Sequence, residues 1–350
     1  MNRRTFISAA SLTLAAGGAT ARAADAPAEN AALSLTDEWD KVFPADPTVA
    51  HRKFVFKNRF DVLLAADLYK PVDAQGKLPA IAVSGPFGAV KEQSSGLYAQ
   101  RLASAGFLTI AFDPSFTGES AGEPRHIAGP DLCTEDFSAA VDYLVTSDEV
   151  DAQRVGILGI CGWGGFALNA AAVDTRIKAT VASTMYDMSR VTANGYNDSG
   201  DDAASRRKLR EALNDQRTRD FRAGTYARTV MNPEPAPDAP QFMKDYFDYY
   251  KRPRGFHPRS VNSGLGWNAT MSLSFLNAPL LAYAGEIESP VLIVHGELAH
   301  SRYFGEDAFK KLKGENKALH IVPGANHVDL YDSDKIPFER IINFYRRAFA

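Results

Sequence analysis

Apolar runs with the length of a strand recur along most of the chain, and amphipathic stretches separate them. The mostly apolar runs cover residues 78–84, 107–112, 155–160, 177–183, 290–295 and 318–322. Continuous apolar runs are typical of strands that are buried on both faces of a parallel sheet. The stretches between them, such as 91–105, 134–146 and 337–349, show helical spacing or an acidic first turn. This alternation predicts an α/β fold with a mostly parallel central sheet, flanking helices and right-handed crossovers.

Two segments depart from this alternation. Residues 53–60 and 62–69 alternate apolar and polar positions around a short turn, which predicts an antiparallel hairpin. Residues from about 186 to 289 contain a charged helical stretch, a Pro-rich stretch and a cluster of aromatic residues, and an insertion of this size predicts a helical cap over a site. The aromatic cluster fits either a pocket for an apolar substrate or the core of the cap itself. It comprises Phe242, Tyr246, Phe247, Tyr249 and Tyr250.

The first 24 residues have the pattern of an export signal peptide. Arg3 and Arg4 precede an Ala-rich apolar region, and Ala21-Arg22-Ala23 has the form of a cleavage site. The arginine pair resembles a Tat signal, although a Sec signal that happens to carry two arginines fits the same residues. We therefore expect a periplasmic or secreted protein with a flexible mature N-terminus over 25–40 and one domain over 41–350.

The charge and the apolar runs argue against two classes of function, nucleic-acid binding and membrane insertion. The formal net charge of −3 gives no sign of nucleic-acid binding, and no internal apolar run has transmembrane length, so we expect no membrane insertion after signal removal. Cys133 and Cys161 could form one disulfide in an oxidising compartment, but nothing in the sequence brings them together. The sequence does not predict the oligomeric state.

The stretch 154–172 places a cysteine between a strand and a helix. An apolar run ends at Ile160, Cys161 and several glycines follow, and an Ala-rich run with good helix propensity begins. This is the layout of a nucleophile elbow, in which Cys161 occupies a strained apex and the helix start favours its thiolate. A buried structural cysteine and a turn that cradles a phosphate fit the same pattern.

Two further polar groups follow late strands, Glu297 after one apolar run and His327 after the last. Nucleophile, acid and histidine in this order are typical of α/β-hydrolases, and the chain resembles that superfamily over essentially its whole mature length. The Gly-Gly pair after Cys161 resembles the dienelactone hydrolases. A wider set of motifs is similar to the YcjY-like hydrolases, namely residues 91–93, 118–120, 122–125 and 299–304.

The resemblance implies a role for each site residue. Cys161 attacks an acyl carbonyl, and His327 takes its proton and later returns it to the leaving group. The backbone N–H groups of Phe87 and Gly162 form the oxyanion hole. The acid stays open, because the family places Asp where this chain has Ala299. Glu297 is the nearest carboxylate, Asp329 is the second candidate, and a Cys-His dyad without an acid is the third possibility.

Three more residues are expected beside the substrate, namely Trp163, Glu119 and Arg125. Trp163 stands where the family has a small residue, and Gly85 stands where it often has His. Glu119 and Arg125 belong to a loop whose Gly-x-Ser-x-Gly letters, over 118–122, lack the flanking strand and helix of an elbow. His295, Glu297 and His300 follow a strand rather than lie on a helix, so we predict no metal site.

These residues indicate an exported hydrolase that cleaves an ester, lactone or related acyl bond of a small-molecule substrate through Cys161, with no cofactor. Two alternatives remain open on the same fold. One is a catalytically silent binding protein, which Trp163, Gly85 and Ala299 favour. The other is an acyltransferase that uses the same triad.

Overall fold

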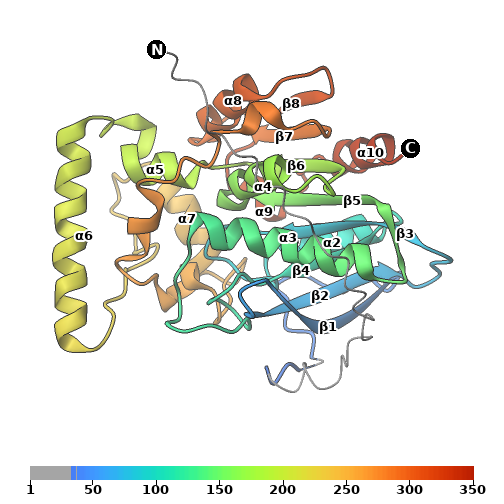
Figure 1. The fold of residues 1–350 in the computed structure, drawn as a ribbon, viewed down its shortest axis with the longest axis horizontal. Coiled ribbons are helices and arrows are strands. Elements are labelled where there is room, and N and C mark those ends of the chain that lie inside the picture. Colours follow the sequence, from blue (N-terminus) through green and yellow to red (C-terminus); the bar gives the residue numbers. More distant parts are fainter. Residues whose placement is uncertain (1–32, 37) are drawn as a thin grey trace, which may run out of the picture.

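The computed structural model describes residues 33–36 and 38–350, and an eight-stranded sheet forms its centre (Figure 1). The strands stand in the order β1-β2-β4-β3-β5-β6-β7-β8. β1 and β2 pair antiparallel, β2 is antiparallel to β4, and the other strands are parallel, as the sequence predicts. Their bounds are β1 Val49–Lys57, β2 Leu63–Pro71, β3 Leu78–Ser84, β4 Leu108–Phe112, β5 Val150–Ile160, β6 Ala179–Ser183, β7 Val291–Gly296 and β8 Lys317–Val322. The predicted signal peptide lies outside the described residues.

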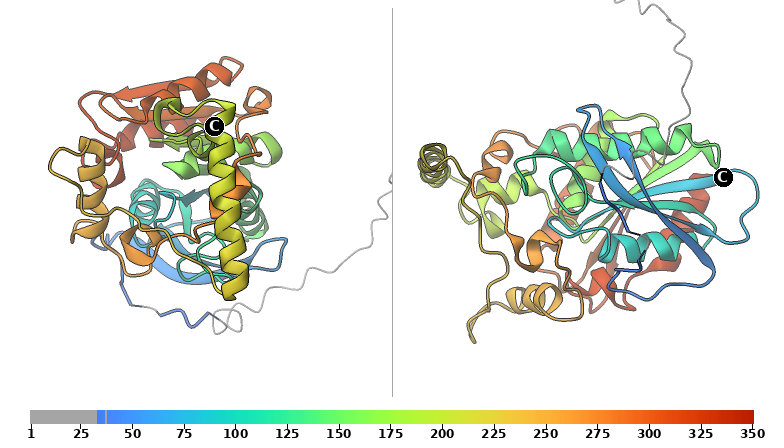
Figure 2. Two further views of the ribbon diagram at one scale, coloured as in Figure 1. Left: turned by 90° about the vertical axis from the view of Figure 1, so that its left-hand side faces the viewer. Right: turned by 90° about the horizontal axis from the view of Figure 1, so that it is seen from below.

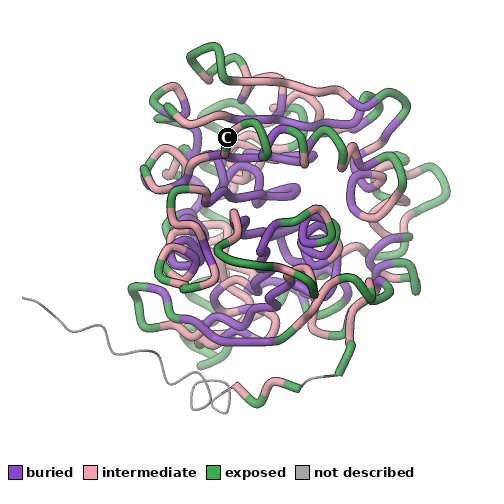
Figure 3. The backbone as a smooth tube through the Cα atoms, turned by 90° about the vertical axis from the view of Figure 1, so that its right-hand side faces the viewer, coloured by how far each residue is buried: buried purple, intermediate pink, exposed green. Residues whose placement is uncertain are grey.

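Helices cover both faces of the sheet, because alternate residues of each strand point to opposite faces. In β3, Ala80 and Ala82 belong to one apolar cluster, whereas Ile81 and Val83 belong to the other. The first cluster is closed by α3, α4 and α8, and the second by α2 and α10. Figure 3 shows the buried strands between these layers. The bounds are α2 Ser94–Ala103, α3 Pro130–Thr146, α4 Gly162–Val173, α8 Arg302–Lys311, α9 Asp329–Asp332 and α10 Phe338–Ala348.

The segment 186–289, called the cap below, joins β6 to β7 with loops, several short helices and one long helix, α6, at one end of the sheet (Figure 1). The helix α6 stands furthest from the sheet (Figure 2), and only Asp220 of its residues is buried. Within the described part of the chain, no helix is both long and apolar enough to span a membrane. The cap contains α5 Met188–Asn194, η1 Tyr196–Asp198, α6 Ala203–Ala223, α7 Gln241–Lys251, η2 Val261–Leu265, η3 Met271–Phe275 and η4 Ala284–Glu286.

The helix predicted over 91–105 begins later, at Ser94. The backbone N–H of Lys91 donates to Asp113 Oδ1 at 2.8 Å, so the residues before α2 form a turn that is tied to the end of β4. The loop that carries Phe87 joins the end of β3 to this turn. The turn therefore fixes one end of that loop.

Candidate active site

Cys161 occupies the sharp turn between β5 and α4. Its backbone adopts φ 57° and ψ −127°, a conformation that a non-glycine residue keeps only where its surroundings enforce it. Two backbone bonds enforce it here, from Cys161 N–H to Ser183 O and from Tyr186 N–H to Cys161 O, each 2.9 Å long. Gly159 is required beside this turn, since a Cβ there would lie 2.0 Å from the carbonyl oxygen of Trp163. The turn therefore has the geometry of a nucleophile elbow.

The structure brings Phe87 and Gly162 to the Cys161 thiol, and interactions with the backbone N–H groups of both residues lower the pKa of that thiol. The cap fixes the loop that carries Phe87. Asn262 Nδ2 donates to the carbonyl oxygen of Phe87 at 2.8 Å, and the N–H of Asn262 donates to that of Gly88 at 3.0 Å. Two N–H donors from different loops thus converge at one side of Cys161, as an oxyanion hole requires.

His327 lies in the same site, 2% exposed, and hydroxyl groups surround its ring. Nδ1 lies 2.5 Å from Ser301 Oγ and 2.9 Å from Thr184 Oγ1. On the opposite side, Nε2 lies 3.0 Å from the hydroxyl of Tyr331. With its proton on Nδ1, the ring donates to the Ser301 and Thr184 hydroxyls and presents the Nε2 lone pair to Tyr331.

The Tyr331 hydroxyl also interacts with the Cys161 thiol and lowers its pKa, so a phenol lies between the predicted nucleophile and the predicted base. Sequence reasoning missed Tyr331, Ser301 and Thr184. Tyr331 follows His327 by four residues, so its spacing was visible in the sequence. Ser301 and Thr184 have no comparable signal, since ordinary serine and threonine residues occur in most loops.

The prediction that Glu297 completes a triad is corrected by the structure. Glu297 is exposed, and its Oε2 accepts a hydrogen bond from the N–H of Gly324 at 2.8 Å. Asp329, the second candidate, pairs with Lys335 Nζ at 2.8 Å and accepts from the N–H of Asn326. Among the described residues, no carboxylate hydrogen-bonds to the His327 ring, which leaves the arrangement without an acid.

Burial keeps the site uncharged. It raises the pKa of the Cys161 thiol, an effect larger than that of the Tyr331, Gly162 and Phe87 hydrogen bonds, which lower it. Burial and the nearby His300 and His295 hold the pKa of His327 well below its usual range. The resting state is therefore a thiol beside a neutral imidazole, because desolvation outweighs the effect of the helix start, which favours a thiolate.

A cavity of about 360 Å³ opens beside Cys161. Most of its wall comes from the cap, and among the described residues no Asp, Glu, Lys or Arg lines it. Tyr246 and Tyr250 of the predicted aromatic cluster line it, whereas Tyr249 packs against the ring of Tyr331 outside the lining. The lining residues are Phe87, Cys161, Tyr186, Met188, Val191, Thr192, Met231, Asn232, Tyr246, Tyr250, Asn262, Trp267, Met271, Ser272 and Tyr331.

Trp163 does not line this cavity, so its predicted place in the substrate pocket is corrected. Its side chain is 1% exposed and packs edge-on against Phe112 and Phe137 in the core. Gly85 is required for a separate reason. A Cβ at position 85 would lie 2.3 Å from the carbonyl oxygen of Ile160 and 3.0 Å from Trp163 Cβ, at φ 107°. The backbone conformation and the close approach to Ile160 therefore account for glycine at this position.

Arg125 and Glu119 also lie away from the cavity, which corrects both predictions. Arg125 holds its own loop, since Nη2 donates to the carbonyl oxygen of Gly118 at 2.8 Å. Ser120, at the centre of the Gly-x-Ser-x-Gly letters, is buried and donates to the carbonyl oxygen of Asp113 at 2.7 Å. This loop is structural, as its poor match to an elbow predicts.

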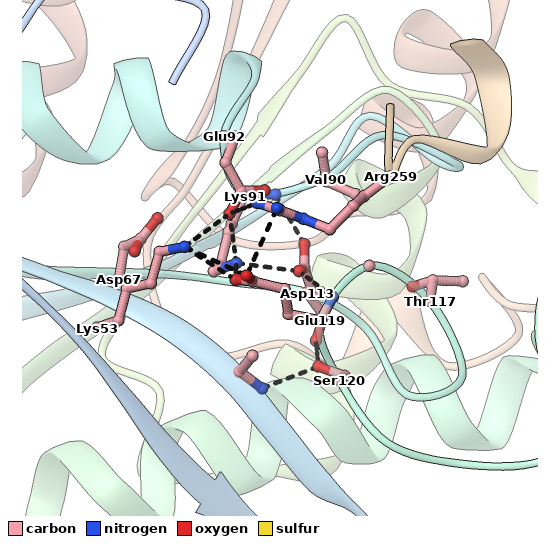
Figure 4. A network of polar contacts seen from close by, with 12 residues as sticks. Lys53, Asp67, Val90, Lys91, Glu92, Asp113, Thr117, Glu119, Ser120 and Arg259 are labelled. Carbon is pink, nitrogen blue, oxygen red and sulfur yellow. Dashed lines mark hydrogen bonds and ion pairs between the residues drawn. The ribbon is translucent and has the colours of Figure 1, made fainter. Parts of the chain in front are cut away.

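Glu119 belongs instead to a buried network of charges around Lys91 (Figure 4). Lys91 lies at its centre and pairs with Glu92, Asp113 and Glu119. Arg259 reaches into it from the cap and pairs with Glu92 at 2.8 Å. Carboxylate oxygens of Asp40, Glu92 and Glu119 come within 4.8 Å of one another, but side-chain cations surround them and account for the cluster.

The histidines that flank Glu297 have separate partners. His295 is buried and contacts the carbonyl oxygen of Met185 through Nε2 at 3.3 Å. His300 pairs through Nε2 with the hydroxyl of Tyr186 and stacks on Phe242 of the cap at 4.2 Å. Their imidazoles thus form the wall around His327, with ring centroids 6.3 and 5.2 Å from it.

The sheet order, the elbow and the histidine after the last strand define an α/β-hydrolase. The family model of the X-Pro dipeptidyl-peptidase (S15 family) matches residues 61–327, and the chain belongs to this family.

Three known proteins are similar to this chain. The crystal structure of hypothetical protein PA2218 from Pseudomonas aeruginosa has a TM-score of 0.87 and 56% identity, and covers 90% of this chain and 98% of that one. The uncharacterised protein YcjY of Escherichia coli is 36% identical over 82% of this chain and 94% of its own length, in agreement with the motifs. Thiohydrolase apmlB of Arthrinium phaeospermum is 33% identical over 37% of this chain and 41% of its own length.

Proposed function

We propose that this α/β-hydrolase cleaves an acyl thioester or ester, lactones included, through a covalent intermediate on Cys161. One observation carries the proposal. Cys161 lies at a strained strand–helix turn and lines a cavity. The backbone N–H groups of Phe87 and Gly162 interact with its thiol. The Tyr331 hydroxyl lies between this thiol and the His327 ring. The Gly-Gly pair after Cys161, as in dienelactone hydrolases, supports the same chemistry.

The reaction follows from these positions. The sulfur attacks the carbonyl carbon as its proton moves toward His327 Nε2, and the carbonyl electron pair moves to the oxygen. The N–H groups of Phe87 and Gly162 stabilise that oxyanion, an effect commonly worth about 3 kcal/mol. The protonated imidazole then returns its proton to the leaving group, and water hydrolyses the thioester on Cys161 by the same route. A thiol needs less activation than a hydroxyl, so the hydroxyl partners of His327 Nδ1 suffice in place of a carboxylate.

The cavity indicates the substrate class. A wall of methionine and aromatic side chains without a formal charge favours an uncharged acyl group of moderate size, because an unpaired charge is expensive to bury. One relative is named a thiohydrolase, which agrees with this class.

The peptidase activity in the family name fits the cavity less well. An N-terminal dipeptide carries an ammonium group, which needs a carboxylate partner, and the described lining has none. We therefore expect no turnover of an X-Pro p-nitroanilide under conditions in which a neutral acyl thioester is hydrolysed.

The test compares wild type with the Cys161→Ala variant on the N-acetylcysteamine thioester of hexanoic acid and on p-nitrophenyl butyrate. Wild type should hydrolyse both, and Cys161→Ala should lose the activity. Cys133→Ala is the matched control, since Cys133 is buried in α3 away from the cavity. Equal inertness of wild type and Cys161→Ala would favour the binding-protein alternative, and activity that depends on an added alcohol or amine would favour acyl transfer.

The compartment of this reaction rests on the N-terminal sequence. Arg3, Arg4 and the small-residue cleavage site support export of the folded enzyme to the periplasm or beyond. The proposed chemistry calls for a small-molecule acyl substrate and no cofactor.

A further inference from the structure

We infer that Tyr331 is a catalytic residue, whose hydroxyl carries the proton between Cys161 and His327. The inference rests on the proposed function, because it concerns the activation of the same sulfur. It adds a third group to a site that the sequence presents as a cysteine and a histidine.

The position of the Tyr331 hydroxyl carries the inference. It lies 3.0 Å from His327 Nε2, interacts electrostatically with the Cys161 thiol and lines the same cavity as that residue. Of the three hydroxyl groups that hydrogen-bond to the His327 ring in the described residues, it is the one that lines the cavity beside Cys161. His327 Nε2, the nitrogen that acts as the base, is therefore already hydrogen-bonded to the Tyr331 hydroxyl. A proton that leaves the sulfur reaches this hydroxyl before it reaches the imidazole.

The surroundings hold Tyr331 in this place. Its carbonyl oxygen accepts from Ser94 Oγ at 2.9 Å, and its ring packs edge-on against that of Tyr249, with centroids 5.1 Å apart. The side chain is fully buried, and burial raises its pKa well above its usual range. It stays a neutral phenol, which accepts a hydrogen bond on oxygen while it donates its own proton.

The step balances without any added reagent. As the sulfur forms its bond to the carbonyl carbon, the thiol proton passes to the Tyr331 oxygen, and the Tyr331 proton passes to His327 Nε2. Tyr331 is neutral before and after, and the imidazole becomes imidazolium. In the second half the imidazolium proton goes to Tyr331 and the phenol proton to the leaving group, as its bond to the acyl carbon breaks.

The titratable groups that face this pair lie on several elements. They are Tyr186 after β6, Tyr246, Tyr249 and Tyr250 on α7, His295 at the end of β7, and His300 after it. Burial raises the pKa of the four phenols and lowers that of the two imidazoles, so all of them are neutral near pH 7. The proton exchanged in the step is therefore shared by Cys161, Tyr331 and His327.

The test compares Tyr331→Phe with Tyr249→Phe. The two tyrosines are buried neighbours, but the Tyr249 hydroxyl has no hydrogen-bond partner among the described residues and does not line the cavity. With the hexanoyl thioester, Tyr331→Phe should lose kcat by about 10²-fold or more with KM little changed, the usual size of a proton-transfer contribution. Tyr249→Phe should stay within about twofold of wild type.

The rate at which iodoacetamide alkylates Cys161 distinguishes a role of Tyr331 in proton transfer from a purely structural role. At neutral pH, Tyr331→Phe should react more slowly than wild type, because its thiol has lost the path to the base. Above the thiol pKa the two should react equally, because hydroxide then removes the proton.

Three results would overturn the relay. These are wild-type turnover by Tyr331→Phe, an equal loss of activity in Tyr249→Phe, or slow alkylation of Tyr331→Phe at both pH values, which marks a structural role. If Cys161→Ala is inactive while Tyr331→Phe is active, the relay fails and the proposed function stands.

Discussion

The Oγ atom of Ser301 lies 2.5 Å from Nδ1 of His327, on the side of the ring where a hydrolase triad has its carboxylate. Ser301 is fully buried, and the Thr184 hydroxyl lies beside it. A hydroxyl orients the ring but supplies no negative charge for the imidazolium. The site therefore relies on the acidity of a thiol rather than on a strong base.

Loss of the Ser301 hydroxyl should slow the reaction modestly. Ser301→Ala removes one hydrogen bond worth about 1 kcal/mol, so kcat should fall about fivefold. Glu297→Gln and Asp329→Asn serve as controls and should stay within about twofold, since neither carboxylate contacts the ring. Kinetics with the hexanoyl thioester check this, and a large loss in either control would restore a carboxylate to the mechanism.

Gly85 should tolerate no side chain. Gly85→Ala places a Cβ 2.3 Å from the carbonyl oxygen of Ile160, which should destabilise the fold by about 1–3 kcal/mol beyond backbone strain. Gly106→Ala measures the backbone strain alone. The φ of Gly106 is 104°, close to the 107° of Gly85, but a Cβ added at Gly106 would have nothing within 4 Å. Urea unfolding of the two variants measures the difference. Equal free energies of unfolding would show that the contact with Ile160 and Trp163 is relieved elsewhere.

The sequence predicts the sheet, the elbow and the place of His327 because each depends on local pattern. Continuous apolar runs define the strands, and glycines around Cys161 define the turn. It does not predict the groups that contact the His327 ring, since Ser301 and Thr184 reach it through tertiary packing. It also does not predict the resting thiol, because the burial that raises the pKa of Cys161 comes from tertiary packing.

Lys91 should be essential to stability. Lys91→Met leaves buried carboxylates of Glu92 and Asp113 without their central cation, which should lower the free energy of unfolding by about 3–5 kcal/mol. The comparison is Lys70→Met, which removes a half-exposed ion pair with Glu149 and should change stability by less than about 1 kcal/mol. Denaturant titration distinguishes the two. A similar small effect for Lys91→Met would mean that Lys53 and Arg259 replace its charge.

Acid should destabilise the protein partly through His295. Burial lowers the pKa of His295 from 6.5 to about 4, so the unfolded chain binds a proton in this range that the folded chain does not. Its contribution to stability is fully present above pH 6.5 and is lost as the pH falls toward 4. His295→Gln should reduce the slope of unfolding free energy against pH by up to about 1.4 kcal/mol per unit. An unchanged slope would show that His295 takes up its proton in the folded state.

The covalent intermediate provides the most direct test of the account. The enzyme is mixed with the hexanoyl thioester, quenched in acid within a fraction of a turnover, digested and analysed by mass spectrometry. The account predicts a hexanoyl group on the peptide that contains Cys161 and none on the peptide with Cys133. Hydrolysis without any acyl adduct on Cys161, or equal turnover by Cys161→Ala, would contradict it.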